Sequence, residues 1–207
     1  MIMRLTKCRL SLLAIFILFV YGASYFWLDL PVLLFFKAHT QNFYHLAGVI
    51  SHALSPAHWL IFAVIVAIGQ FFLPKRFIRL RDCLREIALS IVIAAVIGAL
   101  LKYGLARYRP IEFFQHHLYG FHFFSMKHDL NSTPSGHTLA VFAGLMPFVW
   151  YCRRAFFPVL VVGVIVMLSR LIYLDHYLAD VWLGAWVGIA SSYFVHHYYQ
   201  SRWVNKS

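Results

Sequence analysis

Charged residues are scarce in this chain. They make up 12% of its 207 residues, whereas apolar residues make up 62%, and the mean hydropathy is +0.73. A soluble domain has roughly 25% charged and about 45–50% apolar residues. The composition therefore excludes an ordinary soluble domain and indicates a chain that lies mostly in lipid.

Cysteine and linker sequence are also in short supply. The three cysteines, Cys8, Cys83 and Cys152, form no CxxC pair and are odd in number, which argues against a disulfide framework or a zinc site. No Pro/Ser-rich linker, low-complexity tract or internal repeat divides the chain. We therefore expect one membrane domain that covers residues 1–207.

Long apolar runs, by contrast, are abundant. A membrane-spanning helix needs about 20 mostly apolar residues, and six runs approach this length: 10–28, 56–73, 84–101, 134–151, 156–174 and 181–199. The first run follows Arg4, Lys7 and Arg9 and could be a signal peptide. It is longer than the roughly 7–15 apolar residues of a signal peptide and no clear A-x-A site follows, so we favour a retained helix. The sequence predicts an all-α, polytopic bundle of about six transmembrane helices.

The basic residues predict the orientation of these spans, because positively charged loops favour the cytoplasm. Six crossings place both termini on one side, which collects 12 of the 18 basic residues: Arg4, Lys7, Arg9, Lys75, Arg76, Arg79, Arg81, Arg85, Arg153, Arg154, Arg202 and Lys206. The net charge of +11 invites a nucleic-acid partner, but loops that meet anionic lipids account for it. We expect cytoplasmic termini, contact with the bilayer and no nucleic acid.

The outer side collects the residues suited to chemistry, beginning with the stretch KYGLARYRP. Lys102 and Arg109 are seven residues apart, about two helical turns, so both can project from one helix face. Pro110 disfavours helix at Arg109, which then marks a turn into a loop. Snorkelling cations at a helix end would give the same pattern.

The next run opens with NSTPSGHT. We expect Thr133 as the N-cap of a helix and Pro134 at its first position. Ser135, Gly136 and His137 then occupy the first turn. Free backbone N–H groups at a helix start form a ready anion site, and Gly136 lets a bound group approach the backbone. An ordinary capped helix start is the alternative.

The link between the fifth and sixth runs reads SRLIYLDHYLAD. His176 and Asp180 lie four residues apart, so they share a helix face and can form a hydrogen bond. A carboxylate on one imidazole nitrogen fixes the tautomer and leaves the other nitrogen free to attack. A helix break near residues 173–175 would bring Arg170 to the same place. As a lone pair, His176 and Asp180 would more often form a structural hydrogen bond.

The combination of the three segments indicates phosphoryl transfer. The predicted topology places all three on the outer side, where cations, a helix N-terminus and two histidines can act on one phosphate. The segments resemble the pattern of the type 2 phosphatidic acid phosphatase (PAP2) superfamily: KxxxxxxRP, PSGH and SRxxxxxHxxxD. The matching positions are Lys102, Arg109, Pro110, residues 134–137, Ser169, Arg170, His176 and Asp180.

The resemblance implies a helix bundle with a phosphate site near the membrane surface and catalysis through a phosphohistidine, with no metal and no cofactor. His176 would be the nucleophile, and Asp180 would orient it. His137 would protonate the leaving oxygen and then help to activate water. The phosphate oxygens would be held by Lys102, Arg109, Ser135, Gly136 and Arg170. Arg107 and Asp175 fall outside the pattern, and we interpret them as neighbours of the site.

The outer loop between the first two motifs favours a lipid substrate. It contains Phe113, Phe114, Tyr119, Phe121, Phe123 and Phe124, and aromatic residues favour the membrane interface. Interfacial anchoring without substrate contact would give the same composition. Phosphatidic acid, phosphatidylglycerophosphate, undecaprenyl pyrophosphate and lipid A phosphates are all candidates. The outward site and short loops suit a bacterial inner membrane with the site facing the periplasm.

Other interpretations compete with a lipid phosphatase. A phosphotransferase could use the same motifs, whereas vanadium-dependent haloperoxidases are soluble and larger. A transporter that only binds anionic lipid would not need His137 or the pair of His176 and Asp180. A metal site is disfavoured, because no HxxxH-type pairing with carboxylates accompanies the eight histidines outside the motifs and the termini: His39, His45, His52, His58, His116, His117, His122 and His128.

Overall fold

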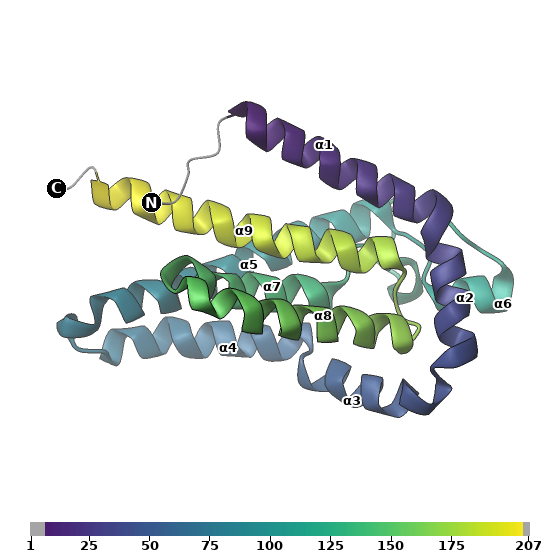
Figure 1. Ribbon diagram of the computed structural model, residues 1–207, viewed down its shortest axis with the longest axis horizontal. Coiled ribbons are helices and arrows are strands. Elements are labelled where there is room, and N and C mark those ends of the chain that lie inside the picture. The colour runs from purple at the N-terminus through teal and green to yellow at the C-terminus, as the bar shows by residue number, and fades with distance from the viewer. Residues whose placement is uncertain (1–6, 205–207) are drawn as a thin grey trace.

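The computed structural model describes residues 7–204, and the side chains of residues 8–201. Every regular element in this range is a helix (Figure 1), as the sequence predicts. The α-helices are α1 (Lys7–Ala23), α2 (Asp29–His39), α3 (Tyr44–Ala53), α4 (Pro56–Gly69), α5 (Ile78–Leu105), α6 (Pro110–His116), α7 (Gly136–Tyr151), α8 (Phe156–Ile172) and α9 (Leu178–Val204). A π-helical segment, Ser24–Leu28, joins α1 to α2.

Five stretches of the described chain are long and apolar enough to cross a membrane: Cys8–His39, Gln41–Phe72, Lys75–Leu105, Arg153–Ile172 and Leu178–Ser201. They overlap five of the six predicted spans. The remaining predicted span, 134–151, corresponds to α7, which has 16 residues. Such a helix is about 24 Å long, shorter than the roughly 30 Å hydrocarbon core of a bilayer. The predicted count of six is therefore approximate.

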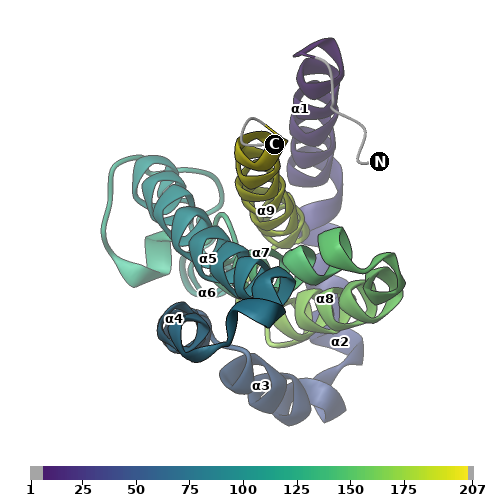
Figure 2. The same ribbon diagram turned by 90° about the vertical axis from the view of Figure 1, so that its left-hand side faces the viewer.

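Helix α7 lies at the centre of the bundle, in contact with α4, α5, α8 and α9 (Figure 2). Its sequence is apolar on all sides, which is typical of a buried helix, and Val141 and Ala143 are fully buried. The outer helices show the opposite pattern, since Phe19 on α1 and Ile65 on α4 are mostly exposed. Exposed apolar faces of this extent are typical of a surface that meets lipid.

Most connections between helices lie at two ends of the bundle (Figure 1). The α4–α5 and α7–α8 connections lie on the left, where α9 ends; this is the basic end, with Arg79, Arg81, Arg85, Arg153 and Arg154. Helix α2, helix α6 and the α8–α9 turn lie on the right, at what we call the site end. The predicted cytoplasmic charges Arg4 and Lys206, and the side chains of Lys7 and Arg202, lie outside the described residues.

Two glycines on α9 allow it to approach the backbone of α7 closely. A Cβ on Gly184 would lie 2.6 Å from the carbonyl oxygen of Ser135, and one on Gly188 would lie 2.5 Å from the carbonyl oxygen of Leu139. Both contacts are with backbone, which cannot turn aside as a flexible side chain can. Small residues at a helix interface are a common means of packing helices in membranes. This packing places the start of α9 beside the start of α7.

Gly188→Ala is therefore expected to destabilise the protein by about 1–3 kcal/mol, because the new methyl group overpacks the α7–α9 interface. Gly22→Ala on α1 is the matched control. Among the described atoms, nothing lies within 4 Å of a Cβ at Gly22. A helical Gly→Ala change in open space is favourable by about 0.5–1 kcal/mol. Thermal unfolding in detergent measures both variants, and equal midpoints would contradict the close packing.

Candidate active site

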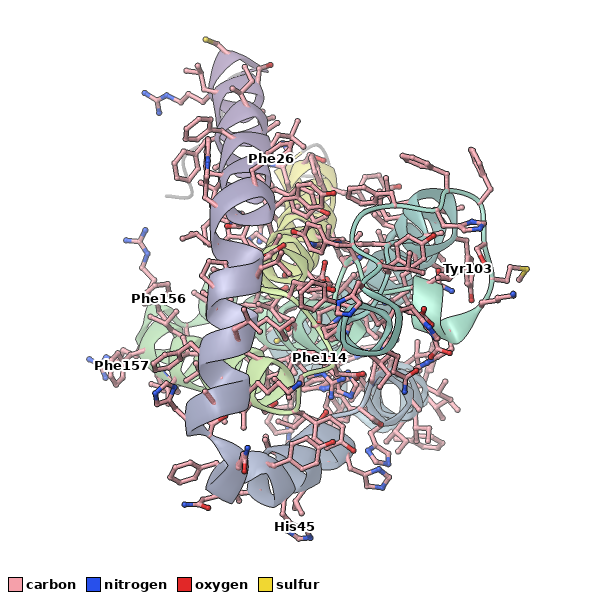
Figure 3. The ribbon with its side chains drawn as sticks, turned by 90° about the vertical axis from the view of Figure 1, so that its right-hand side faces the viewer. Phe26, His45, Tyr103, Phe114, Phe156 and Phe157 are labelled. Atoms are coloured by element: carbon pink, nitrogen blue, oxygen red, sulfur yellow. The ribbon has the colours of Figure 1, made fainter. Side chains whose placement is uncertain are left out.

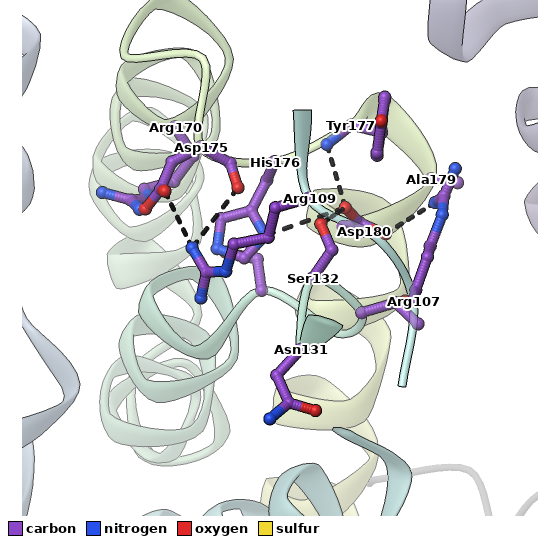
Figure 4. A network of polar contacts seen from close by, with 12 residues as sticks. Arg107, Arg109, Asn131, Ser132, Arg170, Asp175, His176, Tyr177, Ala179 and Asp180 are labelled. Atoms are coloured by element: carbon purple, nitrogen blue, oxygen red, sulfur yellow. Dashed lines mark hydrogen bonds and ion pairs between the residues drawn. The ribbon is translucent and has the colours of Figure 1, made fainter. Parts of the chain in front are cut away.

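Three segments that are far apart in the sequence meet at the site end (Figure 4). One runs from the last turn of α5 to the start of α6, one leads into α7, and one is the turn from α8 into α9. Together they contain all eight residues that the sequence analysis selects for catalysis or phosphate binding. The structure therefore brings the predicted residues to one end of the bundle.

Helix α5 ends at Leu105, because Ala106 has a left-handed conformation (φ 45°) and the chain turns away. Lys102, in the last turn of α5, donates from Nζ to the carbonyl oxygen of Asn131 at 2.8 Å. Arg109 lies beyond the helix, in extended backbone just before α6. The prediction that it shares a helix face with Lys102 is therefore wrong, whereas the predicted turn at Arg109 is confirmed.

Arg109 is held in place from several directions. Its Nε donates to the carbonyl oxygen of His128 at 2.9 Å, and its backbone N–H donates to the carbonyl oxygen of Asp129 at 2.9 Å. Its Nη1 donates to Oδ1 of Asp175 at 2.7 Å. The guanidinium is therefore fixed near the turn that carries His176.

Helix α7 begins later than the sequence predicts. Its first helical residue is Gly136 and its N-cap is Ser135, so the expected cap at Thr133 is wrong. The backbone N–H of Ser135 donates to the carbonyl oxygen of Asp180 at 3.0 Å, which ties the start of α7 to the start of α9. A Cβ on Gly136 would lie 3.9 Å from Cε of Lys102, so the lysine side chain lies beside the helix N-terminus. An anion at this helix start would meet both N–H groups and a cation.

His176 lies in the turn between α8 and α9 and is 2% exposed. Because α9 begins two residues later, at Leu178, the prediction that His176 and Asp180 share a helix face is wrong. The two side chains still face each other, with Nδ1 of His176 3.7 Å from Oδ2 of Asp180. This distance is longer than a hydrogen bond, and among the described residues Nδ1 has no hydrogen-bond partner.

The Asp180 carboxylate is fixed by three other donors. Its Oδ2 accepts from Oγ of Ser132 at 2.5 Å and from the backbone N–H of Tyr177 at 2.9 Å. Its Oδ1 accepts from Nη1 of Arg107 at 2.6 Å. A carboxylate held this firmly can orient an imidazole that moves toward it.

The surroundings of His176 favour its neutral form. Burial lowers the pKa of His176 well below its ordinary value; the Asp180 carboxylate opposes this, and the nearby Arg109, Arg170 and Lys102 reinforce it. A neutral imidazole has a free lone pair on one ring nitrogen, and this lone pair is required for nucleophilic attack. The buried cluster of cations therefore suits His176 to attack an anionic group bound among them.

Arg170 lies at the end of α8, and the turn over residues 173–177 breaks the helix where the sequence predicts. Its guanidinium is almost fully buried and contacts Oγ of Ser51 on α3 and Oδ2 of Asp175. His137, in the first turn of α7, is partly buried and within electrostatic reach of His176, Arg170 and Lys102. Both histidines therefore border the same group of cations.

A fully buried network centred on Arg107 was missed by the sequence analysis. Arg107 forms ion pairs with Asp29 on α2, at 2.5 Å, and with Asp180, at 2.6 Å, and all three side chains are 0% exposed. Oδ1 of Asp29 also accepts from the backbone N–H of Ala179 at 2.8 Å. The interpretation of Arg107 as a mere neighbour is incomplete, because it contacts the carboxylate that faces His176.

Aromatic rings complete the enclosure of Arg107. Its guanidinium lies 4.4 Å from the ring centroid of Tyr177, 4.9 Å from that of Tyr25 and 5.3 Å from that of Tyr119. Tyr119 also donates from its hydroxyl to the carbonyl oxygen of Tyr25 at 2.6 Å. Part of the aromatic outer loop therefore packs inward around the cation.

The later part of the outer loop, residues 122–129, is mostly exposed. Phe124 is 88% exposed and Met126 is 80% exposed. In the view onto the site end, Phe114 lies near the middle of the bundle (Figure 3), and Lys37 of α2 places its Nζ 3.7 Å from the centre of that ring. Exposed apolar side chains therefore lie on the loop that connects two segments of the site. Among the described residues, no three His, Cys, Asp or Glu side chains gather as metal ligands.

Comparisons with known proteins identify the fold and the family. LpxE from Aquifex aeolicus has a similar structure, with a TM-score of 0.61 and 18% sequence identity over 83% of this chain and 96% of that one. The first transmembrane PAP2 type phosphatidylglycerolphosphate phosphatase from Bacillus subtilis has a TM-score of 0.59 and 19% identity, over 92% and 96%. No curated protein sequence matched significantly. A sequence model of the PAP2 superfamily matches residues 84–203, more than half of the chain. This chain is an integral membrane protein that belongs to the PAP2 superfamily.

Proposed function

We propose that this protein is a lipid phosphatase that forms a phosphohistidine on His176. The observation that supports this most strongly is the convergence of three cations, the N-terminus of α7 and two histidines at one end of a membrane bundle. Lys102, Arg109 and Arg170 supply positive charge for the phosphate oxygens. Ser135 and the backbone N–H of Gly136 supply neutral donors at the helix start. Residues 1–207 act as one domain in this proposal.

In the first step, Nε2 of His176 attacks phosphorus in line with the scissile bond. A P–N bond forms and the P–O bond to the lipid breaks, and its electron pair goes to the leaving oxygen. His137, which takes up a proton when the anionic phosphate lies beside it, donates this proton to the leaving oxygen. Nδ1 faces Asp180 across 3.7 Å, so Asp180 stabilises the positive charge that develops on the ring of His176.

In the second step, water attacks the phosphohistidine. His137, now neutral, accepts a proton from the water as its oxygen bonds to phosphorus. The P–N bond breaks, Nε2 regains its lone pair, and inorganic phosphate leaves. The cations stabilise the charge on the equatorial oxygens in both steps, which is the main contribution expected in phosphoryl transfer.

A lipid substrate is supported by the position of the site. The cationic cluster lies at the end of membrane-spanning helices, and the loop between α6 and α7 exposes apolar side chains such as Phe124 and Met126. The two similar structures are described as LpxE and as a phosphatidylglycerolphosphate phosphatase. We propose that the site faces the periplasm of a bacterial inner membrane, with both termini in the cytoplasm.

A panel of substrates tests this proposal. The purified protein in detergent, with EDTA and no added metal, is incubated with phosphatidic acid, phosphatidylglycerophosphate, undecaprenyl pyrophosphate, lipid A and a soluble phosphomonoester. Release of phosphate from one lipid, undiminished by EDTA, is the expected result. Release that stops with EDTA would overturn the metal-free mechanism. Release only when a second lipid is added as acceptor would identify a phosphotransferase.

The pH profile tests the state of His176. Because the pKa of His176 lies well below its ordinary value of 6.5, the ring stays neutral as the pH falls through 6.5, and nucleophilic activity is lost only at lower pH. We expect no acid limb near pH 6.5 that originates from the enzyme. The value of kcat/KM is measured against pH for two substrates whose phosphate groups ionise at different pH. A limb that stays near 6.5 with both substrates would contradict the neutral imidazole.

A further inference from the structure

The carboxylate of Asp175 lies between two arginines of the site (Figure 4). Its Oδ1 accepts from Nη1 of Arg109 at 2.7 Å, and its Oδ2 accepts from Nη2 of Arg170. Within the described residues, no other carboxylate forms an ion pair with either guanidinium. One carboxylate therefore uses both of its oxygens on the same two cations that we assign to a phosphate.

This arrangement has a physical reason when no phosphate is bound. The side chains of Arg109 and Arg170 are 9% and 3% exposed, and a buried cation without a counter-ion is costly. Asp175 supplies that counter-ion. It belongs to the turn between α8 and α9, and its side chain is 30% exposed, so it has a route toward solvent.

A bound phosphate and the Asp175 carboxylate compete for the same donors. Two anions that share one set of guanidinium groups repel each other at close range, so binding of phosphate requires the carboxylate to move. The gain from this exchange depends on charge. A terminal phosphate carries about −1.5 to −2 near pH 7, whereas a phosphodiester carries only about one negative charge.

We propose that Asp175 is a positioning residue that holds Arg109 and Arg170 in place and sets an affinity threshold: a terminal phosphate binds strongly enough to displace its carboxylate, whereas a phosphodiester does not. A dianion gains attraction when it replaces a carboxylate, whereas a monoanion only exchanges one unit charge for another. Diester headgroups greatly outnumber terminal phosphates in a bilayer, so such a filter keeps the site free of them. This inference rests on the proposed phosphatase function.

The test compares Asp175→Asn with wild type in mixed micelles. The amide keeps the size of the side chain and removes its charge. We expect the inhibition constants of inorganic phosphate and of phosphatidylglycerol, a diester with one negative charge, each to fall about tenfold. The fall should be similar for the two anions, because each displaces the same carboxylate. The diester should therefore inhibit turnover of the variant at surface concentrations that leave wild type unaffected, and kcat should change much less than the inhibition constants. Asp175→Glu should restore weak binding of the diester.

Asp129→Asn is the matched control. It removes the same charge at the same end of the bundle, but its side chain is 60% exposed and pairs with His128 rather than with an arginine of the site. Solvent screens a charge so exposed, and we expect inhibition constants close to those of wild type. A fall in stability and kcat of Asp175→Asn with unchanged inhibition constants would reduce Asp175 to a structural role and overturn the inference.

Failure of the inference can be told apart from failure of the proposed function. Equilibrium dialysis with radiolabelled inorganic phosphate measures binding without turnover. If wild type releases no phosphate from any lipid, the proposed function fails, and tighter phosphate binding by Asp175→Asn would still support displacement of the carboxylate. If wild type is active and both proteins bind phosphate equally, the function stands and the inference fails.

Discussion

Replacing His176 with alanine is expected to lower kcat for phosphate release by at least about 10³-fold. The variant retains the cations and the start of α7, so it keeps the groups that bind phosphate and loses only the proposed nucleophile. Inorganic phosphate should still bind, which equilibrium dialysis measures directly. Activity near the wild-type level would exclude a phosphohistidine at this position.

Controls are needed because His176 is buried. His116→Ala changes the same residue type at the same end of the bundle, on the exposed C-terminal turn of α6, and should retain full activity. His176→Asn preserves more of the buried volume than alanine, so its thermal midpoint shows whether a loss of activity reflects unfolding. A fall in activity of both His176 variants with unchanged midpoints isolates the chemical step.

The covalent intermediate offers a second and independent measurement. His137→Ala removes the group that activates water in the second step. With a radiolabelled lipid pyrophosphate, whose leaving phosphate depends little on a proton, the first step is spared and a phosphohistidine should accumulate on the enzyme. A P–N bond of this kind is labile in acid and stable in alkali, unlike a phosphoserine ester. No label in His137→Ala, together with slow release of free phosphate, would favour direct attack by water.

The general architecture and the place of the site could be predicted from the sequence. Long apolar runs predict spanning helices because lipid requires them. The basic residues then predict which connections lie at the same end. Lys102, His137 and His176 belong to connections at one end, so their convergence follows from topology. The roles assigned to these residues rest on their chemistry and on the family, and they remain predictions.

Local geometry at the site could not be predicted, because contacts between distant segments set it. Helix α7 starts at Gly136 rather than at Pro134, and the bond from the Ser135 N–H to the Asp180 carbonyl ties this start to α9. His176 likewise lies outside α9, in a turn held by the contacts of Asp175. Spacing along one chain cannot report such bonds.

The network of Arg107 was missed for a similar reason. Asp29 lies 78 residues from Arg107, and Asp180 lies 73 residues from it, so no motif spacing connects them. One signal was present: Asp29 is a lone acidic residue at the end of the first long apolar run. A carboxylate near membrane depth needs a partner, and an arginine outside the family motif was available. The sequence alone could therefore have suggested an ion pair between Asp29 and Arg107.

Arg107→Met is expected to destabilise the protein by about 3–5 kcal/mol, because it leaves two buried carboxylates without their shared cation. Asp29 and Asp180 are both 0% exposed, so water cannot replace the guanidinium. Activity should fall as well, since the carboxylate that faces His176 loses its strongest donor. Unfolding by titration with SDS in mixed micelles measures the stability.

The number of buried charges that lose their partner predicts the order of stability among the variants of this network. Asp29→Asn leaves Arg107 paired with Asp180 alone, so we expect a smaller loss of stability than in Arg107→Met. The double variant Arg107→Met/Asp29→Asn leaves one buried carboxylate without a cation instead of two, so it should be more stable than Arg107→Met alone. Such a non-additive result is expected for residues that are in contact. Arg85→Met is the control: Arg85 is 35% exposed, lies 3.7 Å from Asp82 and donates to Oε1 of Gln70 at 3.0 Å, and loss of a partly exposed pair and one hydrogen bond costs about 1–2 kcal/mol. Equal stability of the Arg107 and Arg85 variants would mean that the buried network does not stabilise the fold, and Asp180 would then need another source of its orientation.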